Sequence, residues 1–178
     1  MDTKKIVKKF LAPNWIPMII CLLIPGVNVL ALLSILFNYL PRQLRANKCV
    51  QKLEAEDKLD DAAADILSGD SKRFMKGKLV MGADAVYSKG QGYAIAYSDV
   101  VWAYKHTQTY ALLFFPIARI NSLQLAVGTA APTGVASMGR DKTDEVKNAI
   151  VEIYRHNPNC LVGYTDDARA KYKALRKG

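Results

Sequence analysis

The sequence predicts an α+β protein built from three parts in order: an N-terminal apolar membrane helix, an amphipathic linking helix, and an antiparallel β domain closed by C-terminal helices. Three observations predict this order. An uncharged apolar run fills residues 11–41, helical periodicity follows it, and short β-rich runs separated by glycine turns begin near residue 70. The predicted boundaries are therefore 1–41, 42–69 and 70–178.

The apolar run is long enough to cross a membrane, because a spanning helix needs about 20 apolar residues. Trp15 and Tyr39 lie near its ends, about 36 Å apart along one straight helix, which is close to the distance between the two interfaces. Pro25 and Gly26 weaken the helix near its middle, and Asn28 adds a polar group there. The predicted anchor residues are Trp15, Pro25, Gly26, Asn28 and Tyr39.

Three arrangements of the apolar run stay open. A kinked single span is favoured, a shallow re-entrant hairpin with Pro25-Gly26 at its tip is second, and a buried or interface helix of a soluble protein is third. Two full crossings are excluded, because the arms Trp15–Ile24 and Val27–Leu40 are each shorter than a span. We expect the protein at the cell membrane with its β domain on the cytoplasmic side.

The chain is basic, with 25 Lys and Arg against 16 Asp and Glu and a net charge of +9. Such a balance favours nucleic acid or an anionic membrane surface as partner. The basic residues flank the apolar run and no nucleic-acid-binding motif is present, so we expect anionic lipid headgroups and no nucleic acid. The predicted membrane-surface contacts are Lys4, Lys5, Lys8, Lys9, Arg42, Arg45 and Lys48.

Residues 42–69 have the periodicity of an amphipathic helix, with Leu44, Val50 and Leu53 at spacings close to helical. Gly69 is the expected stop. The acidic residues in the middle lack the glycine and the ligand order of a calcium loop. We therefore predict a solvated helix face here and no metal site.

The last part begins with short β-rich runs and ends with helices. The turn SKGQG contains Gly90 and Gly92, which permit a positive φ. The clearest strand is VVWAYKHTQTYALLFF, and the final segment DDARAKYKALRK is an amphipathic helix capped by Thr165 or Asp166. Between them, a helix places on one face Val146, Ala149, Ile150, Ile153 and Tyr154.

Antiparallel strands closed by a helix predict a strongly bent sheet or partly open barrel. The stretch GKLVMGADAVYSKGQGYAIAYSDVVWAYK, followed later by DEVKNAIVEIYRHNPNCLVGYTDDARAKYK, resembles the pleckstrin-homology-like domain of uncharacterised bacterial membrane-anchored proteins. The resemblance covers residues 72–173. It implies a pleckstrin-homology-like β-barrel or sheet in the cytosol, without established catalysis.

Eukaryotic lipid-binding domains of this fold use basic residues around the first hairpin, where this chain has Lys72, Arg73, Lys76 and Lys78. Their spacing does not reproduce that motif. A solvated strand face is therefore favoured over a specific headgroup site, with a diffuse electrostatic contribution to membrane contact.

The sequence offers little for catalysis. The three cysteines form neither a disulfide framework nor a zinc spacing. Cys160 lies four residues after His156, so a cysteine nucleophile is one alternative, but no family signature surrounds it. The glycine-rich stretches do not match a phosphate loop. We predict that the protein is not an enzyme and has no cofactor, no metal and no catalytic residues.

These observations predict a membrane-anchored, non-catalytic interaction or scaffold module that presents its β domain to a protein partner of unknown identity. Addition of a strand to an exposed sheet edge is one binding mode open to such a domain. The alternative is an accessory subunit of a larger membrane transport or secretion complex, in which Pro25, Gly26 and Asn28 pack against partner helices.

Overall fold

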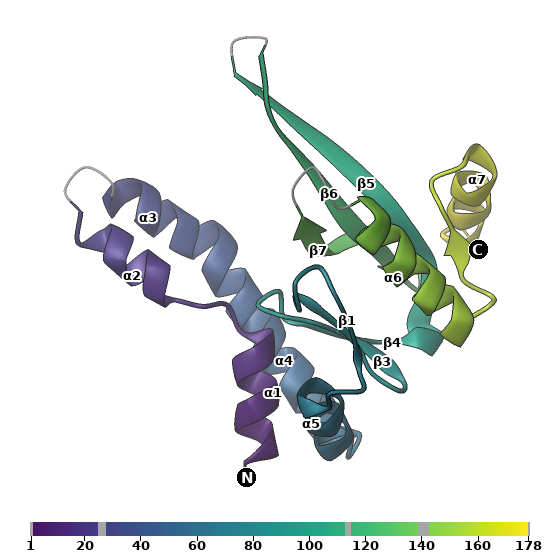
Figure 1. Cartoon of the computed structure of the whole chain (residues 1–178), viewed down its shortest axis with the longest axis horizontal. Coiled ribbons are helices and arrows are strands. Elements are labelled where there is room, and N and C mark those ends of the chain that lie inside the picture. Colours follow the sequence, from purple (N-terminus) through teal and green to yellow (C-terminus); the bar gives the residue numbers. More distant parts are fainter. Residues whose placement is uncertain (1, 25–27, 113–114, 139–142, 178) are drawn as a thin grey trace.

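The computed structural model describes residues 2–24, 28–112, 115–138 and 143–177. The protein is α+β, with a helical N-terminal region followed by two separate sheets (Figure 1). The helices before the first strand are α1 (Thr3–Leu11), α2 (Ile16–Leu22), α3 (Asn28–Ser34), the π-helical turn η1 (Ile35–Tyr39), α4 (Leu40–Ala55) and α5 (Leu59–Leu67).

The first sheet is an antiparallel meander in the order β1-β2-β3-β4, with strands β1 (Lys72–Phe74), β2 (Leu79–Met81), β3 (Ala85–Ser88) and β4 (Tyr93–Ala96). A 3₁₀ turn, η2 (Tyr97–Asp99), carries the chain into the second sheet, whose order is β7-β6-β5-β8. Its strands are β5 (Val100–Leu112), β6 (Phe115–Val127), β7 (Thr133–Met138) and β8 (Leu161–Val162), and the last two helices are α6 (Thr143–His156) and α7 (Asp166–Leu175).

Of the two predicted forms, a strongly bent sheet or a partly open barrel, the barrel is wrong, because the strands form two separate sheets and neither closes on itself. The chain leaves the first sheet at η2, and β5 then pairs with β6 and β8 instead of with β4. The long β5–β6 hairpin also extends well beyond the rest of the second sheet (Figure 1). Among the described residues, the edge strands are therefore β1 and β4 in the first sheet and β7 and β8 in the second.

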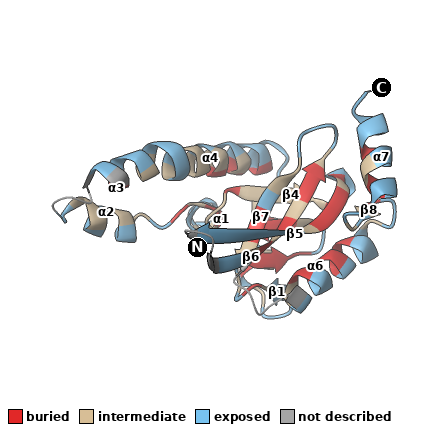
Figure 2. Ribbon diagram, turned by 90° about the horizontal axis from the view of Figure 1, so that it is seen from above, coloured by how far each residue is buried: buried red, intermediate tan, exposed pale blue. Residues whose placement is uncertain are grey.

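The first sheet has a core on each face, because successive side chains of a strand point to opposite faces. In β2, Leu79 and Met81 enter the central core, which the two sheets share with α6, whereas Val80 enters the helix-side core under α1, α4 and α5. In β3, Val86 enters the central core and Tyr87 enters the helix-side core. Figure 2 shows this buried surface running along the strands and one side of α6.

The predicted N-terminal membrane helix is also wrong. Over the described ranges, the chain forms no helix with both the length and the apolar character needed to cross a membrane. The chain reverses direction between α2 and α3, which lie side by side (Figure 1). The rings of Trp15 and Tyr39, expected at opposite interfaces, consequently lie with centroids 5.4 Å apart.

Residues 42–69 form α4 and α5, with a break at 56–58 where Asp57 has φ +56°. α4 and α5 do more than connect the apolar segment to the β domain, because both contribute side chains to a core. Ala46 and Val50 of α4 and Ile66 of α5 are buried in the helix-side core against the first sheet. The helical region and the first sheet therefore form one packed body.

Candidate functional site

The most exposed apolar surface of the described chain comprises residues 16–24 and 28–39, that is α2 with the two residues after it, then α3 and η1, and we call it the apolar helical pair. It stands apart from the sheets at one end of the molecule (Figures 1 and 2). Most of its large apolar side chains are exposed, with Leu23 78% and Phe37 75% exposed, whereas the small Ala31 is buried. A water-facing surface of this kind marks an interaction site. Its other large exposed residues include Ile16, Ile19, Ile20, Ile24, Val29, Leu32, Leu33 and Leu36.

Two aromatic residues lie at the base of the apolar helical pair. Trp15 is the residue before α2, and its ring contacts Tyr39 at the end of η1. The Trp15 indole Nε1 donates to Gln43 Oε1 at 3.3 Å, and Gln43 Nε2 donates to Asn47 Oδ1 at 3.3 Å. This polar chain fixes the start of α2 against α4.

The base is also joined to the first sheet. The carbonyl oxygens of Phe10 and Leu11, at the end of α1, accept hydrogen bonds of 2.9 Å from the amides of Gly90 and Gly92. These amides satisfy helix-end carbonyls that have no partner within α1. The β3–β4 turn, residues 89–92, therefore sets where α1 ends and where the apolar helical pair begins.

Basic side chains gather around the same base. Lys8 and Lys9 occupy the last turn of α1, while Arg42 and Arg45 lie near the start of α4. Arg45 donates from Nε to Gln91 O at 3.3 Å, which ties it to the β3–β4 turn. The charge-free run from residue 11 to 41 thus ends in cations on both sides.

The other predicted surface lysines lie elsewhere. Lys4, near the opposite end of α1, pairs with Glu54 at 2.7 Å, and Lys5 pairs with Asp2 at 3.1 Å. Lys48 is exposed on α4. Of the predicted anchor residues, Asn28 begins α3, whereas the predictions for Pro25 and Gly26 fall outside the described residues.

A groove of about 880 Å³ opens between the base and the two sheets, and we call it the cationic groove. Its walls come from the α1–α2 connection, η1, the start of α4, the β1–β2 and β3–β4 turns, and β7. No Asp or Glu appears among the described residues that line it. Its five cationic side chains are Lys9, Arg42, Lys76, Lys78 and Lys89.

The sequence does not predict this groove. Its pattern places Lys76 and Lys78 on a solvated strand face and gives Lys89 no role. Nothing in the linear spacing connects the β1–β2 turn with the β3–β4 turn or with α1 and α4. The only signal available was that each turn places lysines beside glycine, at Gly77 and Gly90.

Lys72 and Arg73, grouped with Lys76 and Lys78 in the sequence analysis, have structural partners. Lys72 Nζ lies 2.8 Å from Glu152 Oε1, and Arg73 Nη2 donates to Ile66 O at 2.7 Å. Both side chains are therefore committed to holding β1 against its neighbouring helices.

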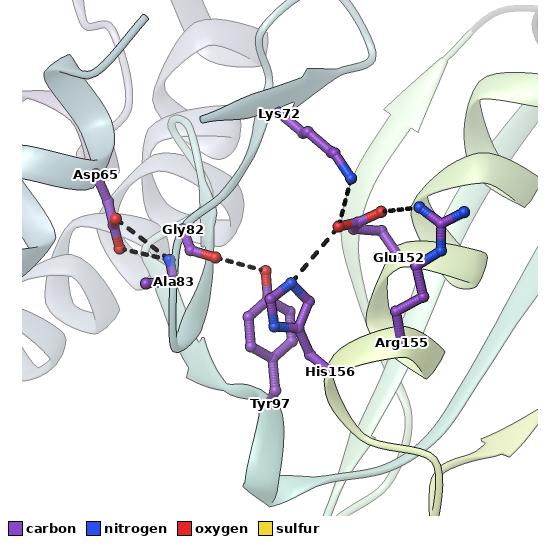
Figure 3. Close-up of polar contacts among 8 residues, drawn as sticks. All are labelled: Asp65, Lys72, Gly82, Ala83, Tyr97, Glu152, Arg155 and His156. Carbon is purple, nitrogen blue, oxygen red and sulfur yellow. Dashed lines mark hydrogen bonds and ion pairs between the residues drawn. The ribbon is translucent and has the colours of Figure 1, made fainter. Parts of the chain in front are cut away.

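Figure 3 shows a polar cluster centred on Glu152 of α6, whose side chain is only 10% exposed. Besides Lys72, its carboxylate is 3.3 Å from Arg155 Nη1 and 3.5 Å from His156 Nε2. The hydrogen bond from Lys72, aided by the nearby positive charges, lowers the pKa of Glu152 despite its burial. An ionised Glu152 thus fastens α6 to β1.

The same cluster continues to the β2–β3 turn. The Tyr97 ring stacks on His156 at a centroid distance of 4.1 Å, and its hydroxyl donates to Gly82 O at 3.1 Å. Burial raises the pKa of Tyr97, so the phenol stays protonated. Asp65 of α5 accepts from the Ala83 amide at 3.2 Å (Figure 3). These contacts join α5, the turn and α6, which is a structural role.

Cys160 has no feature of an activated nucleophile. It is 4% exposed in the central core, and burial raises the pKa of its thiol to about 11. The Cys160 thiol donates a hydrogen bond to Leu161 O, with Sγ 3.3 Å from that oxygen. A thiol needs a lowered pKa to react at neutral pH. His156 is engaged with Tyr97 and Glu152.

The comparisons with known proteins give this chain no relative. No family model, no curated protein and no solved structure matches it. The resemblance to pleckstrin-homology-like domains stays a prediction from the sequence.

Proposed function

We propose that this protein is a non-catalytic interaction module that attaches to an anionic lipid surface through the apolar helical pair. Attachment involves one leaflet only and no crossing. The β domain, which we propose to be pleckstrin-homology-like, then faces the aqueous side and presents its open sheet edges to a protein partner. Strands β1 to β7, which pair antiparallel within each of the two sheets and are followed by α6, support that assignment of the domain.

The observation that carries the proposal is the order of side-chain types along one direction of the molecule. Uncharged apolar side chains occupy the apolar helical pair, Trp15 and Tyr39 lie at its base, and Lys9 and Arg42 follow immediately. A bilayer presents hydrocarbon, then the interface favoured by Trp and Tyr, then anionic headgroups. The order of side-chain types in the protein therefore matches the order of the layers in the bilayer.

The dimensions agree with attachment to one leaflet. At about 1.5 Å per residue, the helical stretches of the pair are about 10 to 20 Å long. Half of a hydrocarbon core is about 15 Å thick. The pair is therefore comparable in length to the thickness of one leaflet and is too short to cross the whole hydrocarbon core.

The proposal is tested by vesicle co-sedimentation of the full chain with phosphatidylcholine vesicles containing about 30% phosphatidylglycerol. The test variant is Leu23→Gln/Leu32→Gln/Phe37→Gln. All three residues are exposed, so their replacement opens no core. We expect binding at least about tenfold weaker, because each large apolar side chain contributes about 1.5 to 3 kcal/mol when fully buried.

The control is Val151→Gln/Tyr154→Gln/Leu175→Gln, which removes from α6 and α7 three large side chains that are about half exposed, at 50%, 48% and 53%. Its vesicle binding should equal that of the wild type. Equal binding by both variants, or no vesicle binding by the wild type, would show that the apolar helical pair has another occupant, such as a partner protein.

A further inference from the structure

We propose that the protruding end of the β5–β6 hairpin joins two copies of this chain, by pairing the edge of β5 in one copy with the edge of β5 in the other. We call this end the ribbon arm, and it comprises residues 105–112 and 115–120. The inference rests on one part of the proposed function, the presentation of an open sheet edge to a protein partner, and deepens it by naming that partner as a second copy.

The ribbon arm extends past the strands that flank the hairpin. β8 pairs only with Trp102 and Ala103 of β5, and β7 pairs only with residues 121–125 of β6. Figure 1 shows the arm projecting beyond both of these strands. The side chains of residues 106–111 are exposed on both faces of the ribbon. Because a two-stranded ribbon alone is marginally stable in water, a further strand at its edge would stabilise it.

The edge of β5 presents backbone groups that can form such a pairing. Gly163 N donates to Ala103 O at 2.9 Å, so the backbone groups of Ala103 point away from β6. Inward and outward groups alternate along an antiparallel strand, and β5 pairs with β6 without a register shift over residues 102–110. The amides and carbonyls that point to the open edge are therefore those of alternate residues, Lys105, Thr107 and Thr109.

The arm has few of the features that protect an edge strand. Edge strands are usually blocked by charged side chains, above all lysine, or by proline. No Asp, Glu, Lys or Arg occurs from residue 106 to 118, and β5 contains no proline. β6 contains Pro116, which has no amide N–H to donate. The edge of β5 is therefore the more suitable of the two for pairing.

The distribution of charge favours a second copy over other occupants. Each copy carries a net charge of +9, so two copies repel each other over their charged surfaces and can meet most easily through an uncharged part that projects from the body. An acidic protein would instead be attracted to the basic surfaces. Hydrocarbon is excluded, because it offers no hydrogen-bonding groups to an open strand edge.

The side chains of β5 are also suited to pairing with themselves. A two-fold axis at Gln108 would place Thr107 opposite Thr109 of the second copy, and both residues point their backbone groups to this edge. Facing threonines stabilise a sheet. The two copies of Lys105 would lie at opposite ends of the paired stretch, so they would not repel each other directly.

Sedimentation velocity of the full chain tests the inference. All proteins carry Leu23→Gln/Leu32→Gln/Phe37→Gln, so that the apolar helical pair does not hold copies together. The edge variant adds Thr107→Lys/Thr109→Lys. The control variant adds Gln51→Lys/Thr129→Lys, which introduces the same charge at exposed residues of α4 and of the β6–β7 turn. Circular dichroism checks that each variant is folded.

Because the contact is small, we expect a dimer with a dissociation constant on the order of 10 μM. The control variant should keep it, whereas dimerisation of the edge variant should be at least about tenfold weaker, because its lysines would face each other. A chain that stays monomeric at about 100 μM overturns the inference. Equal dimerisation of the edge and control variants also overturns it.

Cysteine cross-linking tests the register, and it does not depend on the edge variant being folded. In a Cys21→Ser/Cys49→Ser background, where the remaining Cys160 is buried, Gln108→Cys should give a disulfide-linked dimer with copper phenanthroline as the oxidant. The axis at Gln108 brings the two thiols together. Ala118→Cys is the control, because Ala118 is exposed on β6 of the same arm and would be separated from its equivalent by both β5 strands. Equal yields from the two variants, including none from either, overturn the inference.

Vesicle co-sedimentation of the wild type separates this inference from the proposed lipid attachment. A chain that binds phosphatidylglycerol vesicles but forms no dimer through the ribbon arm overturns the inference and leaves lipid attachment standing. A chain that dimerises through the ribbon arm but does not bind these vesicles refutes lipid attachment and supports the inference.

Discussion

Neighbouring basic side chains in this protein have different roles, depending on the groups that they contact. Lys72 and Lys76 belong to the same short stretch, yet Lys72 is bound to Glu152 while Lys76 lines the cationic groove. Arg73 is likewise held by the carbonyl of Ile66. A positive charge alone therefore does not identify a residue that binds an anion. A cation with no acidic partner among the described residues is the better candidate.

Glu152→Gln should destabilise the native protein at neutral pH by about 1 to 3 kcal/mol, because Lys72, Arg155 and His156 lose the anion that they surround. The folded-state pKa of Glu152 is lowered, so its stabilisation is complete above the unfolded-state pKa and is lost as pH falls through the folded pKa. The unfolding free energy of the wild type should therefore fall more steeply with acidification than that of the variant.

Urea unfolding between about pH 7 and about pH 3 measures both effects. Glu54→Gln is the control, because Glu54 pairs with Lys4 at the surface, where both side chains are half exposed. Such a pair contributes about 0 to 1 kcal/mol. Equal losses for the two variants would contradict the role assigned to Glu152.

At the scale of elements, one turn determines how the helical region meets the sheets. The β3–β4 turn donates two amides to the end of α1 and passes close to α4. Gly92 has φ +77°, and a Cβ there would lie 2.7 Å from both Ala46 N and Arg42 O. Only glycine permits this approach, because the backbone conformation and the available space both exclude a side chain.

Gly92→Ala should lower the unfolding free energy by about 2 to 4 kcal/mol, since the strained φ and the contact with α4 both add to the cost. Gly128→Ala is the matched control. Gly128 also has a positive φ, +54°, but its added Cβ meets no atom within 4 Å. Thermal unfolding of both variants should show the larger loss at Gly92, and equal losses would mean that the turn moves away from α4 freely.

At the scale of the whole molecule, the first sheet is the wall shared by the helix-side core and the central core. Val80 and Tyr87 face the helices, while Leu79, Met81 and Val86 face the second sheet. Loss of either core removes support from the same strands. We therefore expect the helical region and both sheets to unfold in one cooperative step.

The two tryptophans report on opposite parts of this body. Trp15 lies at the base of the apolar helical pair, and Trp102 packs under α7 with Tyr172. The urea transition followed by fluorescence should coincide with that followed by far-ultraviolet circular dichroism in both Trp102→Phe and Trp15→Phe. Using the same variant for both signals removes any effect of the substitution on stability. Separated transitions would show two independent units.

Local patterns predicted much of the secondary structure. Val146, Ala149, Ile150 and Ile153 of α6 are buried as their spacing indicated, and Thr165 caps α7 by accepting from the Ala168 amide. Tyr154, predicted to lie on the same helix face, is 48% exposed. The helical period places a residue at the edge of a face, and only the neighbouring element decides whether that edge is covered.

The candidate site was predicted only in part. Trp15, Tyr39, Lys9 and Arg42 were identified from the apolar run and its flanks, and they do lie together. Their predicted separation was wrong, because a reversal of the chain brings both ends of the run to one place. Lys89 was missed, because a residue in a distant turn has no local relation to this run.

By itself the sequence determined the apolar, uncharged character of residues 11–41, the basic flanks, and the change from helices to strands near residue 70. These depend on side-chain chemistry and short-range periodicity, which act within a few residues. Only the tertiary structure decided that α2 packs against α3 instead of continuing the same helix, that neither sheet closes, and that cations from four segments line one groove. Those outcomes depend on contacts between residues far apart in the chain, and no local pattern encodes them.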